Sequence, residues 1–519
     1  MVLLLQWLYT KLRNNKNLPD LAPGSLPLLG HGLMFLRQPT KIAAILSDPR
    51  VPKVLRFTTP VGDIYVPTGS SEIVSVFMNP KTYDFVAMKT LVQRDVFGVP
   101  KPVLRLIQED DSGFSVKPLA GSKVSPHRRY NYMEHRANDE LVKPPAIAAV
   151  MQHFEESLTK NLETCEVPKS GEWATIPNLY LFVRGIVTKA VTDSFFGPNL
   201  LLSQPQLEQE FWEHDSNIGF FANRIPRWLS PKPYRVRDRC YRAFEQWRAK
   251  AFQKAEKEGG EIPLWSRHAG FKINTVRNSV FQRFEEWTEW ARASSDFSLM
   301  FGVNSNTVKV SFWYFAETWR NKELFPEALE EVNKSMTVDR SGNRRFDVEK
   351  LISSPLLESI FMETLRMYVA LFVMRETTRD AELGNKLVPA GSTVLVSSWS
   401  QHMNEGNWNP DNDPNIPPAT EFWGKRFLEY PEDGSAPRFR MDYLSGGKWT
   451  AFSMGEHLCP GRHIAKRQVL LTFAHLATRF DVEAVGDGDV CLERDMKYFG
   501  YGTMPPKTAI SCRIRRRNV

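Results

Sequence analysis

Cysteine is scarce in this chain, which holds five cysteines among 519 residues. They show no C-x-x-C pair and no regular spacing, and they stand at Cys165, Cys240, Cys459, Cys491 and Cys512. The pattern argues against a disulfide scaffold and for a reducing compartment.

Linkers, low-complexity tracts and internal repeats are missing as well. Hydrophobic residues make up 42% of the chain, enough for a large core, and no Gly/Ser-rich stretch divides it. We therefore expect one large domain over residues 26–519. It should be mainly α with small β-sheets (α+β), because helical patterns dominate after residue 140 while Val51–Thr68 and Lys386–Ser398 resemble strands.

The amino terminus lacks an apolar run long enough to span a bilayer. Met1–Tyr9 is apolar, but a membrane-spanning helix needs roughly 20 residues. Basic residues follow this run rather than precede it, which excludes a cleaved signal peptide. The order apolar, basic, proline-rich favours a membrane-proximal segment and hinge over residues 1–25, with a short interfacial helix or a disordered end as the alternative.

The motifs of nucleic-acid binding are absent too. The net charge is +8, but the chain has no zinc spacing, no RNA-binding aromatic signature and no helix-turn-helix pattern. We expect no nucleic acid partner. The positive charge suits an anionic membrane surface and an acidic redox partner.

What the chain does have is a lone cysteine in a glycine-rich turn, Phe452-Ser-Met-Gly455-Glu-His-Leu-Cys459-Pro-Gly461. The amphipathic run Arg462–Phe480 follows it and predicts a helix. A thiolate near a helix amino terminus is stabilised by free N–H groups and the helix dipole. Glycines let a flat ligand approach the backbone, and an aromatic ring can pack against it. These properties suit a cysteine that ligates haem iron, with a buried structural cysteine as the alternative.

This motif resembles the signature of the cytochrome P450 family of haem-thiolate monooxygenases, and further family landmarks follow in order. Glu363-Thr-Leu-Arg366 lies in a predicted helix, Leu356–Val369, where its two charges share one face. Arg426 lies in a segment that resembles the family's arginine-bearing meander. The resemblance implies a single haem-thiolate fold in which Glu363, Arg366 and Arg426 form a buried structural network, and it implies haem b as cofactor.

By the same resemblance, Cys459 is the metal ligand, and the residues that contact the cofactor are Cys459, Phe452, Gly455, His457, Gly461 and Arg375. Arg375, in an extended stretch at Leu371–Thr377, and His457 are implied to contact the haem propionates. An earlier segment, His127–Arg136, is basic and aromatic but lacks the family's pattern. We interpret it as a solvated basic face.

Residues Met300–Arg320 are predicted to form a long buried helix, which in the family crosses the oxygen side of the haem. Most members place an acid and then a threonine there. Aligned from Arg320 backwards, this chain has Ser305 and Asn306 instead, followed by Thr307. This stretch is similar to the branch that contains bile-acid-forming sterol hydroxylases and prostacyclin synthase. The alternative is that Asn306 only caps an internal helix distortion.

The resemblance leaves two reaction classes open. A monooxygenase would hydroxylate or epoxidise a substrate with O2 and electrons from an NADPH-cytochrome reductase, and Ser305, Asn306 and Thr307 would be the catalytic residues that guide protons. An isomerase or dehydratase would rearrange a peroxide or a pre-oxidised substrate without electron input. A non-enzymatic haem sensor is a third, disfavoured reading, because the complete distal helix would then have no purpose.

Apolar content and the membrane-proximal segment indicate a small lipophilic substrate, of a terpenoid, steroid or polyketide-like class. The overall style of the sequence resembles fungal members of the family that act in secondary metabolite biosynthesis. We expect the protein at the cytosolic face of the endoplasmic reticulum membrane. Four stretches are candidates for the substrate pocket, although each is equally typical of ordinary core: Phe85–Ile107, Asn217–Pro226, Phe301–Thr307 and Val369–Met374.

Overall fold

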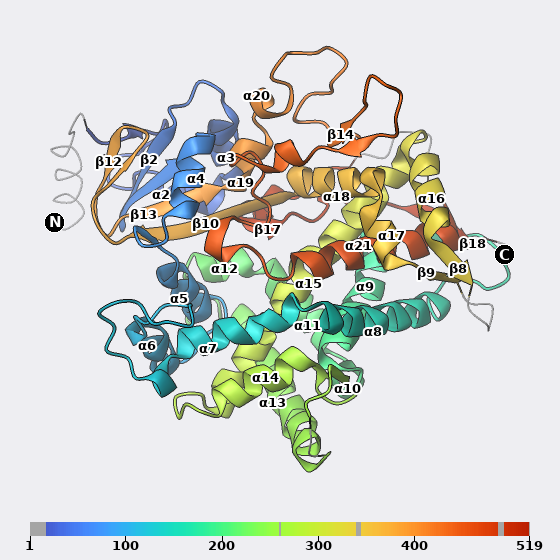
Figure 1. Ribbon diagram of the computed structural model, residues 1–519, viewed down its shortest axis with the longest axis horizontal. Helices are drawn as coiled ribbons and strands as arrows, with labels where there is room; N and C mark the ends of the chain where they lie inside the picture. The colour runs from blue at the N-terminus through green and yellow to red at the C-terminus, as the bar shows by residue number, and fades with distance from the viewer. Residues whose placement is uncertain (1–16, 259–260, 339–343, 486–491, 518–519) are drawn as a thin grey trace. The chain divides into compact units, whose positions relative to one another are not determined.

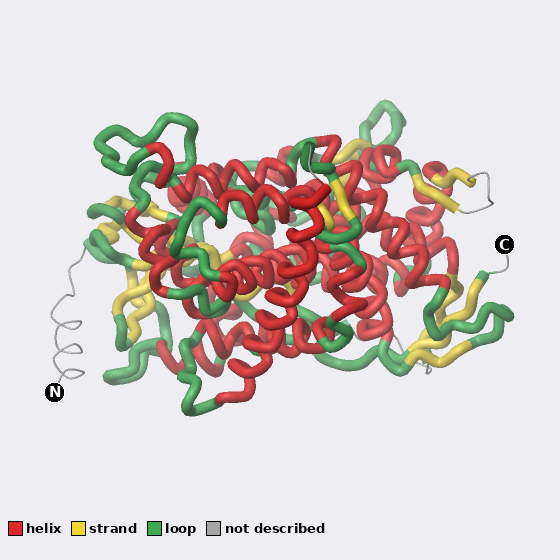
Figure 2. Tube along the Cα trace, turned by 90° about the horizontal axis from the view of Figure 1, so that it is seen from below, coloured by secondary structure: helices red, strands yellow, loops and turns green. Residues whose placement is uncertain are grey.

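The computed structural model describes residues 17–258, 261–338, 344–485 and 492–517, and in these it is mainly helical with small sheets (Figures 1 and 2). The predicted α+β class is confirmed. The apolar run Met1–Tyr9 and Cys491 lie outside the described residues. The boundary at residue 26 stays a prediction. The chain divides into two compact units, each built from segments that are far apart in the sequence.

The first unit takes residues 17–89, 358–459 and 494–507, and a seven-stranded sheet organises it. The strand order is β1-β2-β3-β13-β10-β17, and β4 pairs with β10. The bounds are β1 Asp20–Leu21, β2 Val54–Thr59, β3 Gly62–Pro67, β4 Tyr83–Asp84, β10 Val369–Thr377, β13 Thr393–Ser397 and β17 Tyr501–Thr503. Both stretches predicted as strand-like contribute strands to this sheet, because their Val- and Thr-rich residues suit a pleated, half-buried surface.

Short helices accompany this sheet. α4 (Ser70–Met78) turns Ile73 and Val76 into the same hydrophobic core as Val394 and Val396 of β13. The other α-helices and strands described in this unit are α2 Gly32–Arg37, α3 Pro39–Ser47, α19 Ser398–His402, α20 Glu405–Trp408, β11 Ala381–Leu383, β12 Lys386–Val388, β14 Leu428–Glu429 and β15 Arg438–Phe439. Most of α18 (Pro355–Tyr368) also belongs here, and β10 begins at the residue after its end.

The second unit takes residues 90–357, 460–493 and 508–519 and is almost wholly helical. Its longest helix is α15 (Glu289–Arg320), which packs against α9, α13 and α21. Thr288 caps α15, since its side chain accepts the N–H of Ala291, and the helix then continues without proline. The predicted long buried helix at Met300–Arg320 is therefore confirmed as part of α15.

The remaining helices of this unit are α5 Val86–Asp95 (which begins in the first unit), α6 Lys101–Glu109, α7 Tyr130–Ala137, α8 Pro144–Glu163, α9 Leu179–Phe196, α10 Asn199–Ser203, α11 Leu207–Ser216, α12 Ile218–Ala222, α13 Pro231–Glu258, α14 Lys272–Phe281, α16 Leu324–Ser335, α17 Val348–Ser353 and α21 Arg462–Arg479. A three-stranded sheet orders β16 (Phe480–Ala484), β18 (Cys512–Arg516) and β5 (Ala174–Ile176). The helix predicted over Arg462–Phe480 is confirmed to within its last residue, where β16 begins.

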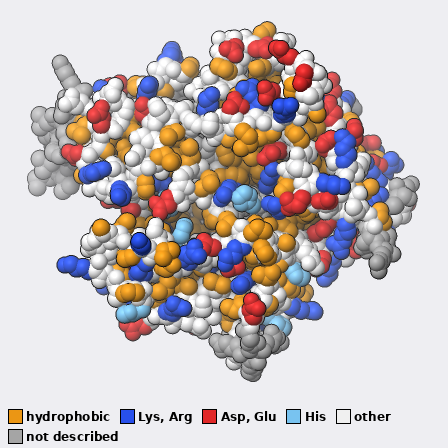
Figure 3. Space-filling model, viewed as in Figure 1, with side chains coloured by type: hydrophobic (Ala, Val, Ile, Leu, Met, Phe, Trp, Pro, Cys, Tyr) orange, Lys and Arg blue, Asp and Glu red, His pale blue; other side chains and the backbone are white. Residues whose placement is uncertain are grey.

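The prediction of a solvated basic face at His127–Arg136 is wrong at Arg129. This side chain is buried and donates to the Ser112 hydroxyl and to the carbonyls of Ser115 and Val116. Elsewhere on the surface, Figure 3 shows basic and acidic side chains mixed over the face in view. Among the described residues, the structure contains no helix whose length and hydropathy would let it cross a bilayer.

Candidate haem-thiolate site

The loop that carries Cys459 is held by its own backbone. The N–H of Cys459 donates to the carbonyl of Phe452 at 3.0 Å, which closes the loop between the two motif residues. Ser453 and Gly455 both take positive φ angles, 66° and 68°. A Cβ at Gly455 would meet the carbonyl oxygen of Phe77 at 2.8 Å, so the close approach of two backbones requires glycine here. The thiol is reduced and only partly buried.

Arg375 and His457 meet through one aromatic ring. The Arg375 guanidinium lies 4.8 Å from the centroid of Phe85, and the His457 imidazole stacks on the same ring at 4.2 Å. Arg375 lies within β10, in the predicted extended stretch. Its guanidinium donates to the Met374 carbonyl at 3.0 Å, and the residue is only 2% exposed. Burial lowers the pKa of Arg375 to about 10, and the charge of Asp84 only partly opposes this. An anion beside the guanidinium would raise this pKa again, because it favours the charged form.

These features fit a haem. The Cys459 thiol can supply a thiolate for iron. Arg375 is a buried cation whose burial Asp84 compensates only in part, and a propionate would compensate it further. Phe452 is partly buried beside Trp449, with 5.6 Å between ring centroids. Gly461 has an ordinary φ of −79° at the cap of α21, so nothing in its backbone conformation requires glycine.

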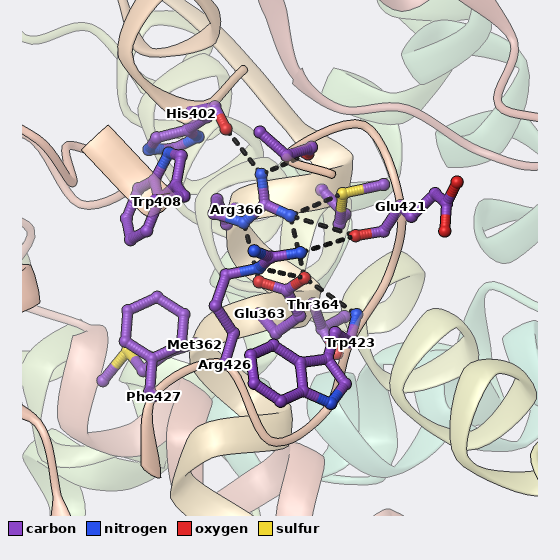
Figure 4. Close-up of polar contacts among 12 residues, drawn as sticks. Met362, Glu363, Thr364, Arg366, His402, Trp408, Glu421, Trp423, Arg426 and Phe427 are labelled. Atoms are coloured by element: carbon purple, nitrogen blue, oxygen red, sulfur yellow. Dashed lines mark hydrogen bonds and ion pairs between the residues drawn. The ribbon is translucent and has the colours of Figure 1, made fainter. Parts of the chain in front are cut away.

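Glu363 forms the centre of a polar network in the first unit (Figure 4). Arg366, one turn along α18, donates to both carboxylate oxygens at 2.7 and 2.8 Å. Arg426 donates to the same carboxylate at 3.1 Å, and the backbone N–H of Trp423 donates to it at 2.9 Å. The structure therefore brings Arg426 into contact with Glu363, which stands 63 positions earlier in the chain, and assembles the three predicted residues in one network.

The network is closed off from water. The side chains of Glu363, Arg366 and Arg426 are 0% exposed. Burial alone would raise the pKa of Glu363, but the charges and hydrogen bonds of Arg366 and Arg426 outweigh it and hold the pKa below its usual value. The remaining guanidinium hydrogens bond to backbone carbonyls, among them those of His402, Ala419, Pro417 and Pro418. The network ties α18 to the irregular segment before the cysteine loop.

The distal helix α15 belongs to the second unit and presents one open face. Gly302 and Asn306, one turn apart, are exposed, and a Cβ at Gly302 would have no neighbour within 4 Å. Ser305 and Thr307 are buried, and so is Asn304, whose amide donates to the carbonyl of Met300 at 3.1 Å. Of the three predicted catalytic residues, only Asn306 lies on the exposed face.

Each of the candidate pocket stretches contains side chains that are buried among protein atoms, although more of their residues are partly or fully exposed. In Phe85–Ile107, for example, Val96, Phe97 and Val103 are at most 5% exposed. Such residues pack the core, as the alternative reading of these stretches anticipated. Sequence reasoning missed two buried charged residues beside the distal helix, Asp215 and Lys309. Asp215 stands 90 positions before its partner Ser305, too far for any local pattern to signal the contact.

Comparison with known proteins agrees with this geometry. Residues 282–512 match the family described as Cytochrome P450. "Cytochrome P450 monooxygenase efuG" of Hormonema carpetanum is 26% identical over 96% of this chain and 90% of its own length. "Cytochrome P450 monooxygenase fsoE" of Humicola fuscoatra is 31% identical over 69% of this chain and 65% of its own. "Cytochrome P450 7B1" of Mus musculus is 21% identical over 99% and 93%.

The match includes the distal helix, the Glu363 network and the Cys459 loop. This chain belongs to the cytochrome P450 family and is of the fungal type. It is an oxidoreductase, and its family binds haem b.

Proposed function

We propose that this protein hydroxylates or epoxidises a small lipophilic molecule with O2 and electrons from an NADPH-cytochrome reductase. The observation that carries the proposal is the Cys459 loop, with its constrained glycine and with the buried, only partly compensated Arg375 in the same unit. Relatives that are named monooxygenases and match most of this chain support the same class.

Each named residue would have a distinct task. Haem bound through a thiolate supplies the oxidising chemistry that cleaves O–O bonds. Cys459 would hold its iron, while Arg375 and His457 would anchor its propionates by charge and hydrogen bonding. Asn306 can donate from its amide nitrogen and accept at its amide oxygen, so it would orient a water molecule rather than act as an acid. Ser305 and Thr307 would guide protons along the same helix.

The substrate class proposed is terpenoid, steroid or polyketide-like, as in secondary metabolite biosynthesis. Support comes from the apolar composition and from the fungal monooxygenases among the relatives. The proposed location is the cytosolic face of the endoplasmic reticulum membrane. The amino-terminal order of apolar, basic and proline-rich residues supports it.

One observation favours a second candidate. Ser305 and Asn306 stand where most family members have an acid and a threonine, so the usual proton-delivering pair is missing from α15. An isomerase or dehydratase that rearranges a peroxide or a pre-oxidised substrate does not need that pair.

Two assays of the haem-loaded protein separate the candidates. One supplies NADPH, a reductase and oxygen to a panel of sterols, sesquiterpenes and aromatic polyketides; the other supplies organic peroxides and endoperoxides without electrons or oxygen. Oxygenated product in the first assay is expected. Rearranged product in the second alone would overturn the monooxygenase. Cys459→Ser is the control, and it should lose the thiolate-type absorbance while the protein remains folded.

A further inference from the structure

Two opposite charges meet inside the second unit, beside the distal helix. Asp215 lies near the end of α11 and Lys309 lies on α15, and the Lys309 ammonium is 2.8 Å from the Asp215 carboxylate oxygen Oδ2. The two residues are 1% and 2% exposed. Burying two charges costs desolvation energy that their attraction often fails to exceed, so such a pair is weak evidence for a stabilising role. Its position on this helix suggests a role in the chemistry.

Ser305 joins the pair. Its hydroxyl donates to the other oxygen of Asp215, and the Lys309 ammonium lies 3.5 Å from the same hydroxyl oxygen. Ser305 is the residue aligned with the family's distal acid. The carboxylate that α15 lacks at this position is thus supplied beside Ser305 by α11. Ser305 directly precedes the exposed Asn306 in the sequence.

The surroundings keep this arrangement in place. The Lys309 ammonium lies 5.7 Å from the centroid of Trp212, whose indole N–H donates to the Thr188 hydroxyl at 3.1 Å. Arg184, which lies on α9, has its guanidinium 5.1 Å from the centroid of the same ring. His214, next to Asp215, sits among phenylalanines, and burial followed by the charge of Arg237 lowers its pKa to about 3. A neutral imidazole there leaves Lys309 as the cation in contact with the carboxylate.

We propose that Asp215, paired with Lys309 and hydrogen-bonded to Ser305, supplies the distal carboxylate missing from α15 and serves as a positioning residue for proton delivery beside Asn306. The Ser305 hydroxyl would turn its hydrogen away from Asp215 and give that proton to a water held by Asn306, and this water would pass one of its own protons to the oxygen that is being reduced. At the same time Ser305 would take a proton from Lys309, and the lysine would regain one from the bulk solvent. Asp215 would hold the ammonium beside Ser305 throughout. The inference rests on the proposed monooxygenase function.

A charge-removing variant tests the proposal, using the panel compound that gives the most product. Asp215→Asn keeps the shape and the acceptor for Ser305 but removes the charge. Product formed per NADPH consumed should fall about 10-fold or more, with a matching rise in hydrogen peroxide. This is less than the roughly 100-fold that a directly acting proton donor contributes at the low end, because Asp215 acts through Ser305. Product formed with cumene hydroperoxide, which enters with its oxygen already reduced, should stay within about 2-fold of the wild type.

A matched control lies on the same helix. Asp296 is also buried on α15, where it accepts from Arg248 and from Arg277, the latter at 3.0 Å. Asp296→Asn removes the same kind of charge from the same helix and should leave product per NADPH at the wild-type value. Unchanged coupling in Asp215→Asn, or an equal loss in Asp296→Asn, would overturn the proposal.

A swap of the two side chains adds a measurement that does not depend on turnover. In Asp215→Ser/Ser305→Asp, the carboxylate would lie one turn before Lys309 on α15, a favourable spacing for an ion pair. In the resting holoprotein, the thermal midpoint of the double variant should exceed the value expected from adding the two single changes. Coupling should recover as well. Additive midpoints, or recovery of the midpoint without recovery of coupling, would overturn the role of the carboxylate.

Failure of the proposed function gives a different result. Wild-type protein that forms product only from peroxides, without NADPH, would overturn the monooxygenase and with it the need for this proton path. Wild-type turnover with NADPH and oxygen, combined with a fully coupled Asp215→Asn, would overturn the proposal for Asp215 alone.

Discussion

The backbone N–H of Thr450 donates to Nε2 of His402 at 3.2 Å. The carbonyl of His402 accepts from Arg366, and Thr450 in turn accepts the N–H of Ser453 at 2.9 Å. A continuous set of hydrogen bonds therefore leads from the Glu363 network to the loop that presents Cys459. The imidazole must be neutral to accept this bond, which makes the connection sensitive to protonation.

His402 predicts a specific pH dependence. Burial, reinforced by the charge of Arg366, lowers the pKa of His402 to about 3 from its usual 6.5. Below pH 6.5 the unfolded chain binds a proton that the folded chain does not. This histidine therefore makes the free energy of unfolding fall by about 1.4 kcal/mol for each unit by which the pH is lowered. His402→Gln should remove that slope between pH 6 and 4. Urea unfolding of both proteins at several pH values measures it, and parallel curves would contradict it.

Glu363→Gln should destabilise the protein by about 3 kcal/mol, because Arg366 and Arg426 would remain buried without their counter-charge. The midpoint of urea unfolding, followed by circular dichroism, measures the loss. Glu349→Gln is the matched control, since Glu349 is 75% exposed in its pair with Arg467. Exposed ion pairs contribute little, so this variant should change the free energy of unfolding by less than about 1 kcal/mol. Equal effects of the two variants would rule out a special role for burial.

Gly455→Ala should lower the yield of haem-loaded protein. The new Cβ would meet the Phe77 carbonyl at 2.8 Å and would also hold a positive φ of 68°, which costs an alanine about 1–2 kcal/mol before the clash is counted. Gly302→Ala is the control and should not lower the yield of haem-loaded protein. Its new Cβ would have open space, and alanine in a helix is more stable than glycine by about 0.5–1 kcal/mol. The ratio of haem absorbance to protein absorbance compares the two variants. A fully loaded Gly455→Ala protein would contradict the close packing of this loop.

Asn306→Ala should uncouple electron uptake from product formation while leaving the fold intact, because the exposed amide would no longer orient water. NADPH consumption, product and hydrogen peroxide are measured in the same reaction. If coupling is unchanged and the thermal midpoint falls instead, Asn306 is a helix-packing residue and the proposal for it fails.

Sequence patterns predicted the long elements well because each carries its own periodic signal. Both ends of α18 and α21 and the carboxyl end of α15 follow the apolar pattern to within a residue, whereas α15 begins at Glu289, well before the predicted start at Met300. The extended stretch around Arg375 lies in β10. The candidate haem ligand could also be identified from the sequence, because glycines and an aromatic residue flank the lone cysteine within one short segment. Local chemistry was sufficient in these places.

Tertiary contacts between distant segments could not be predicted. Arg129 reads as a surface residue from its basic neighbours, yet carbonyls some 13 residues earlier surround it. Lys309 reads as one charge on an otherwise apolar helix face, and only the packing of α11 against it reveals its carboxylate partner. The burial of a charge depends on residues remote in sequence, which periodicity does not record.

The junction between α18 and β10 restricts where residues can be inserted into or deleted from this chain. The helix ends at Tyr368 and the strand begins at Val369, so no loop separates Arg366 of the polar network from Arg375. Side chains alternate between the two faces of a strand, and one residue inserted or deleted in this stretch would turn Arg375 to the other face. Relatives that diverge in length should therefore do so in their surface loops, while the spacing of nine residues between these two arginines stays fixed.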